Sequence, residues 1–390
     1  MMRGLGLRAD WYVLLPHHSY FGVTKHIHNL LQGQDGSLSA DELATYFGEA
    51  QAEAKYLKGH EAMGDVWFMH DPQVLPLSQH VRWSQHERRL WVCHLDLSAP
   101  NPSTLETLLP LAHYHDGVVF SLESYAPPGT NGMQVHIIPP AIDPLSSKNR
   151  ALPLVRAQRI VAGLGVDMAR PMVAQVSRFD VWKDPWGVID AYRMARERVP
   201  GLQLVYLGVV QAKDDPEAME MIRSVEAYAG GDPDIHLVHD GESLPVPVDE
   251  LVNAVQVAAQ VVMQKSTREG FGLSVTEAMW KGTPVIGGNV GGIRHQLVHG
   301  DSGYLVDSPQ EAGEYLVELL RDPEMASEMG KRARERVREH FLLPRLLLDY
   351  LKAAQASMES RPFTGSGRVA TGMPGAENAR SLGLAADGGC

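Results

Sequence analysis

A glycine-rich turn opens an apolar segment within residues 264–287, and this stretch restricts the fold of the chain more than any other. Glu269 is followed directly by residues 270–272, Gly-Phe-Gly, and the apolar run after them carries Glu277. A Gly-Thr-Pro turn ends the run, and a strand-like Val-Ile pair comes next. This order predicts a loop, a helix and a strand, the repeating unit of an α/β sheet.

The start of this predicted helix suits an anionic ligand. A helix that begins with glycines leaves backbone N–H groups unpaired and presents the positive end of its dipole, an arrangement that binds phosphate. Glu277 lies five residues after Gly272, close enough to accept hydrogen bonds from hydroxyls on the same ligand. A phosphate beside hydroxyls indicates a nucleotide. The alternative is an ordinary helix-to-strand crossover with a solvated acid.

Composition restricts the class of protein. The 390 residues favour two domains, and 44% apolar with 21% charged residues is typical of a globular chain. The net charge of −12 argues against nucleic acid as a partner, because a binder needs a basic face. Only Cys93 and Cys390 are present, which suits a reducing cytoplasm. No signal-peptide pattern and no long apolar run occurs, so we expect a cytoplasmic protein without membrane spans.

Short apolar runs alternate with helical patterns in the first half of the chain. We expect strands at residues 11–15, 66–69, 90–93, 117–120 and 135–138. Two of them end in a histidine and an aspartate, namely His70 with Asp71 and His94 with Asp96. Ligands of open parallel sheets lie beyond the carboxyl ends of strands, so these side chains are candidates for a site. The alternative for each pair is a polar cap on a strand end.

The strand pattern restarts in the second half, at residues 172–176, and a helix is expected at 186–198. Arg178 and Lys183 follow that strand closely. Two cations at a strand end suit a diphosphate, which arginine binds through its planar fork and lysine as a point charge. The alternative is a pair of surface cations.

The chain resembles the retaining GT-B glycosyltransferases. Three segments of the second half carry the resemblance: S-R-F-x3-K-D-P at 177–185, R-E-G-F-G-L-x-V-x-E-A-M-W-K-G-x-P-V-I at 268–286 and G-G-I at 291–293. A closer resemblance, to the trehalose-forming branch of that family, is carried by F-x-V-T-K-x-x-H-N-x-L-Q-G at 21–33, H-D-P-Q at 70–73, C-H-L-D-L-S at 93–98, P-x-I-D-P-L-S-x-K-N-R at 140–150 and A-K-D-D-P at 212–216. It extends over about residues 5–355.

The resemblance implies an α/β fold of the GT-B type, two Rossmann-like domains with parallel sheets facing a central cleft. Residues 1–150 would form the acceptor-side domain, ending in a polar linker at 146–150. Residues 151–340 would form the domain that binds a nucleotide sugar. Residues 341–360 would be a helix packed back on the first domain. The Gly-, Ser- and Ala-rich residues 361–390 are expected to be a disordered tail.

The resemblance also implies a reversible reaction, in which glucose passes from a nucleoside-diphosphate glucose to free glucose and gives α,α-trehalose. Retention is ascribed in this family to same-face attack, with the leaving phosphate oxygen taking the acceptor proton. No protein nucleophile, cofactor or protein-bound metal is then required, and Mg²⁺ would act only as a stimulating ion. Neither nucleic acid nor membrane is expected as a partner, and the oligomeric state stays open, a homodimer included.

Family roles are implied residue by residue. Arg178 and Lys183 would hold the diphosphate, Glu269 would contact the transferred glucose and Glu277 the ribose hydroxyls. The side chains of His94 and Asp96 would face the reacting sugar. The residues implied to be catalytic are Arg178, Lys183, Glu269 and His94, and those implied to bind substrate are Lys25, Asp71, Asp96, Gly270, Phe271, Gly272, Leu273 and Glu277.

Family members carry a strand and a Gly-rich loop before the helix with which this chain begins. We expect that strand to be central in the first sheet, so its loss would expose backbone groups and reduce the core. We therefore expect either that the start codon of this sequence is assigned too late or that the protein has an incomplete cleft. Two other functions stay open: a retaining trehalose phosphorylase that uses inorganic phosphate, and a nucleotide-binding scaffold without activity.

Overall fold

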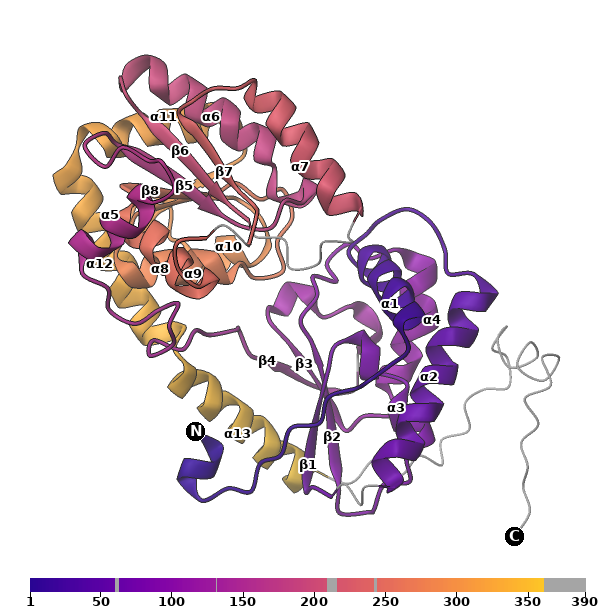
Figure 1. Cartoon of the computed structure of the whole chain (residues 1–390). Coiled ribbons are helices and arrows are strands. Elements are labelled where there is room, and N and C mark those ends of the chain that lie inside the picture. Colours follow the sequence, from indigo (N-terminus) through magenta and orange to yellow (C-terminus); the bar gives the residue numbers. More distant parts are fainter. Residues whose placement is uncertain (60–62, 131, 209–215, 242–243, 361–390) are drawn as a thin grey trace, which may run out of the picture.

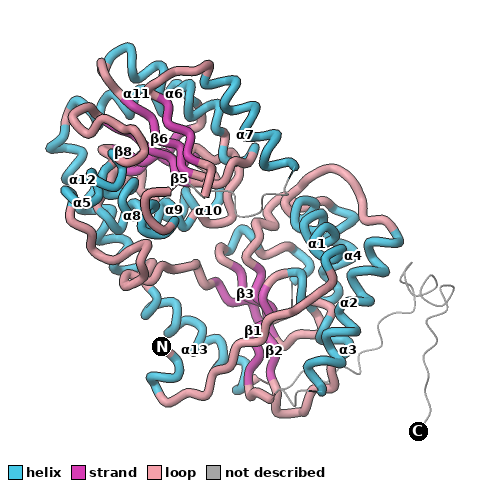
Figure 2. The backbone as a smooth tube through the Cα atoms, viewed as in Figure 1, coloured by secondary structure: helices cyan, strands magenta, loops and turns pink. Residues whose placement is uncertain are grey.

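The computed structural model describes residues 1–59, 63–130, 132–208, 216–241 and 244–360, which form two α/β lobes (Figure 1). The expected tail at 361–390 lies outside the described residues, as does most of the motif at 212–216. Each lobe is built around one parallel sheet with helices packed beside it (Figure 2). No helix of the described residues has both the length and the apolar character needed to cross a bilayer.

The N-terminal lobe contains four parallel strands in the order β1-β2-β3-β4. They are β1 (Val66–His70), β2 (Arg88–Cys93), β3 (Gly117–Phe120) and β4 (Gln134–Ile137). The helices are α1 (His18–Leu31), α2 (Ala40–Gly59), α3 (Leu77–His80) and α4 (Pro102–Ala112), with 3-10 turns at Met2–Leu5, Pro72–Val74, Glu123–Tyr125 and Pro128–Thr130. Helix α1 buries Tyr20, Val23 and Ile27, which recur at helical spacing and form one apolar face toward the sheet.

The strand expected at residues 11–15 is wrong, because the structure has no regular element there. Trp11 and Leu15 are 77% and 78% exposed. The ring of Trp11 packs on His70 of β1, with ring centroids 5.8 Å apart. An apolar run becomes a strand only where a neighbouring backbone pairs with it, and here the Trp11 and Tyr12 rings contact β1 side chains instead.

The C-terminal lobe contains six parallel strands in the order β10-β9-β8-β5-β6-β7. They are β5 (Met172–Val176), β6 (Gln203–Leu207), β7 (Ile235–Val238), β8 (Val261–Gln264), β9 (Val285–Gly288) and β10 (Tyr304–Val306). The helices are α5 (Leu154–Ala162), α6 (Pro185–Arg198), α7 (Pro216–Ala229), α8 (Val248–Ala258), α9 (Leu273–Lys281), α10 (Gly291–Gln296), α11 (Pro309–Arg321) and α12 (Pro323–His340), with a 3-10 turn at Val181–Lys183. Strands β5, β6, β8 and β9 are buried along their whole length, as in a sheet covered on both faces.

The chain passes between the lobes twice, and the two crossings pair with each other. Ile142 N donates to Phe341 O over 2.9 Å, and Leu343 N donates to Ile142 O over 3.1 Å. After the second crossing, α13 (Leu343–Glu359) lies against the N-terminal sheet (Figure 1), where the Tyr350 ring meets Phe68 at 4.9 Å. We call this paired segment, residues 142 and 341–343, the hinge between the lobes.

Candidate active site

Lys183 and Glu269 form the centre of the candidate site. Lys183 follows β5 and Glu269 follows β8, neighbouring strands at which the chain order of the sheet reverses. Ligands of open α/β sheets bind at such a switch point, beyond the carboxyl ends of the strands. Lys183 Nζ lies 2.5 Å from Glu269 Oε2, and only 14% and 11% of the two side chains are exposed. Ser266 Oγ donates to the same carboxylate oxygen over 3.1 Å.

The loops that carry this pair are tied together. Thr267 N donates to Trp182 O over 2.9 Å, which joins the loop after β8 to the turn that holds Lys183. Asp184 has a φ of 46°, a conformation that non-glycine residues rarely adopt, and Lys265 forms an ion pair with its carboxylate. Strained backbone of this kind persists only where the surroundings hold it, as they do at many functional sites.

Glycines let two helix starts approach the loop after β8. Gly272 precedes α9 with a φ of 85°, and no side chain caps the first turn of that helix. A Cβ on Gly291 would lie 1.9 Å from Glu269 O, and one on Gly292 would lie 2.3 Å from Phe271 Cα. The start of α10 therefore packs on the backbone of residues 269–272, which we call the donor loop after the role that the resemblance implies for it. The uncapped first turn of α9 is suited to an anion.

A histidine pair lies at the carboxyl ends of β1 and β2. His70 Nδ1 is 2.9 Å from His94 Nε2, and the rings stack with centroids 5.2 Å apart. Burial, and then the charge of His94, lowers the pKa of His70 to about 4, so this ring is neutral at pH 7. Asp71 has a φ of 67°, and its Oδ1 accepts from His94 N over 3.2 Å. Asp96 is buried and accepts from Ser98 N over 2.9 Å.

The two lobes meet at the donor loop. Tyr125, which follows β3, places its hydroxyl 2.8 Å from Gly270 O and 3.1 Å from Glu269 O. Burial raises the pKa of Tyr125, and the charges of Asp96 and Glu269 raise it further. A Cβ built on Gly270 would lie 3.3 Å from His94 O. The donor loop thus lies directly against the carboxyl ends of the N-terminal strands.

Three of the expected site residues, Arg178, Leu273 and Lys25, are exposed, unlike the mostly buried Lys183–Glu269 pair. The Arg178 side chain is 78% exposed and bonds to Asp180, with Nη2 3.3 Å from Oδ2. Leu273 is 43% exposed at the start of α9, and Lys25 is exposed on α1. Burial lowers the pKa of His28, and the charge of Arg178 lowers it further. Helix α1 carries Lys25 one turn before His28.

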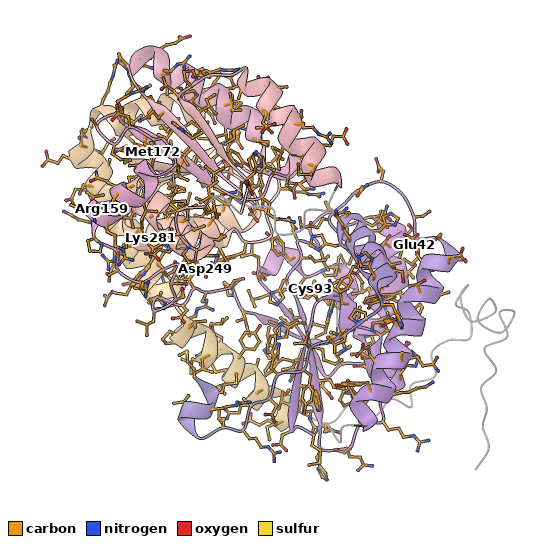
Figure 3. All side chains as sticks on the ribbon, in the orientation of Figure 1. Glu42, Cys93, Arg159, Met172, Asp249 and Lys281 are labelled. Atoms are coloured by element: carbon orange, nitrogen blue, oxygen red, sulfur yellow. The ribbon has the colours of Figure 1, made fainter. Side chains whose placement is uncertain are left out.

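Glu277 lies in a separate charged cluster on α9. It is 7% exposed, and its Oε1 lies 3.7 Å from Lys148 Nζ. Lys281 Nζ, one turn further along α9, donates to Asn149 Oδ1 over 2.8 Å. Burial raises the pKa of Glu277 and lowers that of Lys281 to about 7. Figure 3 labels Lys281 together with Asp249 of α8, whose Oδ1 lies 3.8 Å from Lys148 Nζ.

Sequence reasoning missed two residues of this region. Tyr125 belongs to none of the sequence motifs. Its position shortly after β3 nevertheless satisfies the rule that ligands lie beyond the carboxyl ends of strands, which singled out His70 and His94. Lys148 was assigned to a linker on account of its polar neighbours, whereas Asn253 of α8 holds that segment by donating to Ser147 O over 3.1 Å. Only the tertiary structure shows that the linker is docked beside Glu277.

Known families match both lobes. Residues 1–127 match the family model described as trehalose synthase, N-terminal domain, and residues 157–336 match glycosyl transferases group 1. The structure is similar to an α,α-trehalose-phosphate synthase (UDP-forming) from Burkholderia vietnamiensis, with a TM-score of 0.70, 15% identity and coverage of 88% of this chain and 87% of that one. The two-lobed architecture and the matched glycosyltransferase segment define the chain as a GT-B glycosyltransferase.

Sequence relatives narrow this class. A trehalose synthase from Rubrobacter xylanophilus is 44% identical over 361 residues, which cover 90% of this chain and 84% of the relative. A trehalose synthase from Pyrococcus horikoshii is 39% identical over 352 residues, covering 90% and 83%. The chain belongs to the trehalose synthase family of glycosyltransferases.

Proposed function

We propose that this enzyme moves glucose from a nucleoside-diphosphate glucose to free glucose, with retention, and so forms α,α-trehalose reversibly. The Lys183–Glu269 pair at the switch point of the sheet carries the proposal, in a chain that is 44% identical to a trehalose synthase. The pair lies beside an uncapped helix start and against the N-terminal lobe. A donor between the lobes would meet a cation, backbone N–H groups and a carboxylate within one small space.

The ion pair supports a division of roles. The donor diphosphate carries more negative charge than one carboxylate, so it would draw Lys183 away from Glu269. Glu269 would then be free to accept hydrogen bonds from glucose hydroxyls. Arg178 is exposed on the same loop and would turn toward the diphosphate from its contact with Asp180. The first turn of α9 would add backbone N–H groups from Gly272 and Leu273.

The remaining roles follow from position. Glu277 would accept from the ribose hydroxyls, which requires it to exchange its contact with Lys148 for the ligand. His94 and Asp96 would lie at the sugar, Asp71 would orient His94, and Lys25 would reach in from α1. Residues 270–272 would line the donor.

The chemistry is positioning combined with electrostatic stabilisation. The bond between the glucose anomeric carbon and the diphosphate oxygen breaks, and the acceptor hydroxyl oxygen forms the new bond on the same face. The acceptor proton passes to the departing phosphate oxygen. Lys183 and Arg178 would stabilise the charge that develops on that oxygen, the kind of preorganised stabilisation that supplies most of the rate enhancement in many enzymes. The low cysteine content leads us to place this reaction in the cytoplasm.

The reverse reaction tests the proposal. Trehalose is supplied with ADP, UDP, GDP or inorganic phosphate, and the released glucose and glycosyl product are measured. We expect cleavage with at least one nucleotide and a nucleoside-diphosphate glucose as product. Cleavage with phosphate alone would show a phosphorylase, and nucleotide binding by calorimetry without turnover would show a scaffold. Sedimentation of the same sample decides whether the enzyme is a homodimer.

A further inference from the structure

A basic cavity lies at the hinge, away from the site described above. It has a volume of about 300 Å³ and is lined by residues of the crossings and of the helices next to them, namely Pro139, His295, Arg336, His340, Phe341, Arg345 and Asp349. Four of these side chains are cations or histidines. Asp349 is the one carboxylate of the lining, and its Oδ2 lies 2.9 Å from Arg345 Nη1.

Backbone oxygens fix the two arginines, and they are the only hydrogen-bond acceptors of Arg336 within the described part of the chain, whereas Arg345 also pairs with Asp349. Arg336 donates from Nε to Gln296 O over 2.6 Å and from Nη2 to His295 O over 2.9 Å. Arg345 donates from Nη2 to Pro139 O over 2.7 Å. Carbonyl oxygens satisfy hydrogen bonds but carry no net charge, so the guanidinium charge of Arg336 has no counter-charge among the cavity residues.

Two histidines complete the lining, and His340 Nε2 lies 3.7 Å from Glu339 Oε2. The His295 and His340 rings stand against Phe341 at centroid distances of 5.9 and 6.0 Å. Partial burial lowers the pKa of His295, and the charges of Arg336, His340 and Arg345 lower it further. An anion in the cavity would offset the arginine charges and so raise the pKa of His295.

We propose that this hinge cavity binds a phosphate group, either inorganic phosphate or the phosphate of a small phosphomonoester. Arginine forks match phosphate oxygens, and fixed guanidinium groups lose little freedom on binding. The cavity exceeds the volume of about 30 Å³ that one water occupies in the liquid by roughly tenfold, so an ester fits as well as the ion.

The cavity is connected to the donor loop. Arg336 holds the backbone of Gln296, and Gln296 Nε2 donates to Phe271 O over 2.5 Å. The Phe341 ring also packs against the Phe271 ring, with the ring centroids 5.8 Å apart. A phosphate bound to Arg336 would therefore act on the donor loop through Gln296. This consequence rests on the proposed function, whereas the binding site itself does not.

Calorimetry with two ligands tests the site. Inorganic phosphate and glycerol 3-phosphate are titrated into the full chain carrying both Arg178→Ala and Lys183→Ala, so that the candidate donor site contributes little. We expect one binding event, weakened about tenfold or more by Arg336→Gln and about threefold by His340→Gln. The exposed His86 provides the matched control, and His86→Gln should leave binding unchanged.

His340→Gln keeps the test decisive if Arg336→Gln disturbs the fold, because the His340 ring is exposed and only its backbone oxygen holds Arg345. Equal affinity for both ligands assigns the site to the phosphate group alone, and tighter binding of the ester assigns it to a phosphomonoester. Absence of binding, or binding that His340→Gln leaves unchanged, overturns the proposal.

Discussion

Lys183 and Glu269 each depend on the other for the electrostatic balance of the site. Their side chains are mostly buried and 2.5 Å apart, so removal of either leaves the other without its counter-charge. We predict that Lys183→Ala and Glu269→Ala each lower kcat/KM by more than about 100-fold, the range typical of losing a preorganised charge. Steady-state kinetics with circular dichroism to verify the fold measures this.

An ion pair on the surface provides the control for these variants. Lys331 and Glu328 pair over 2.5 Å with 69% and 54% of their side chains exposed. Such pairs contribute little, so Lys331→Ala should leave both activity and stability nearly unchanged. Activity like that of the unmodified enzyme in Lys183→Ala would contradict the roles assigned to the pair.

At the scale of elements, the start of α10 supports the donor loop only because it carries glycine. Gly291 has a φ of 42°, and a Cβ there would lie 1.9 Å from Glu269 O. We predict that Gly291→Ala displaces the donor loop and raises the KM for the nucleotide sugar at least tenfold. Kinetics and a thermal melt of the purified variant measure the two effects.

Gly300→Ala is the control that separates the effect of backbone strain from the effect of the Cβ clash expected in Gly291→Ala. Gly300 also has a positive φ, 77°, but a Cβ there meets nothing within 4 Å. Gly300→Ala should lower the free energy of unfolding by about 1 kcal/mol through backbone strain and leave the KM for the nucleotide sugar unchanged. Equal KM changes in both variants would show that contact with the donor loop is not the cause.

The contact between the lobes depends on one hydroxyl of the turn after β3. Tyr125 Oη lies within hydrogen-bond distance of two donor-loop oxygens, and its ring belongs to the N-terminal core. Tyr125→Phe keeps the ring and removes the hydrogen bond. We predict a loss of about 1 kcal/mol in stability and a fall of roughly fivefold in kcat/KM. An unchanged kcat/KM would mean that this contact does not position the loop.

Much of the element order was readable from periodicity, because long buried strands and amphipathic helices have strong patterns. The strand predicted at 172–176 agrees with β5, and those predicted at 66–69 and 90–93 differ from β1 and β2 by a few end residues. The strand-end rule also drew attention to Lys183 and His94. Contacts between distant segments were not readable, since the approach of Lys148 to Glu277 depends on how a linker docks rather than on local pattern.

For the whole molecule, two histidines held neutral by burial should contribute to the loss of stability in mild acid. Burial is the main cause that lowers the pKa of His70 and of His115, each to about 4. The unfolded chain binds these protons near pH 6.5, whereas the folded chain does so only near pH 4. Their contribution to stability is therefore complete above pH 6.5 and is lost progressively as the pH falls toward 4.

Urea unfolding at several pH values measures this loss. Each histidine contributes a slope of about 1.4 kcal/mol per pH unit between the two pKa values. His115→Gln should reduce the slope by that amount, while the exposed His86→Gln should not change it. An unaltered slope in His115→Gln would show that this ring titrates in the folded protein as it does in the unfolded chain.

At the scale of the whole molecule, both lobes would act on the same reaction, the transfer of glucose to glucose. The most direct measurement incubates a nucleoside-diphosphate glucose with glucose labelled with ¹³C at the anomeric carbon and follows the product by NMR. We predict α,α-trehalose with one labelled and one unlabelled anomeric carbon, both in the α configuration. Free glucose from hydrolysis of the donor as the sole sugar product, or a β linkage, would contradict the account.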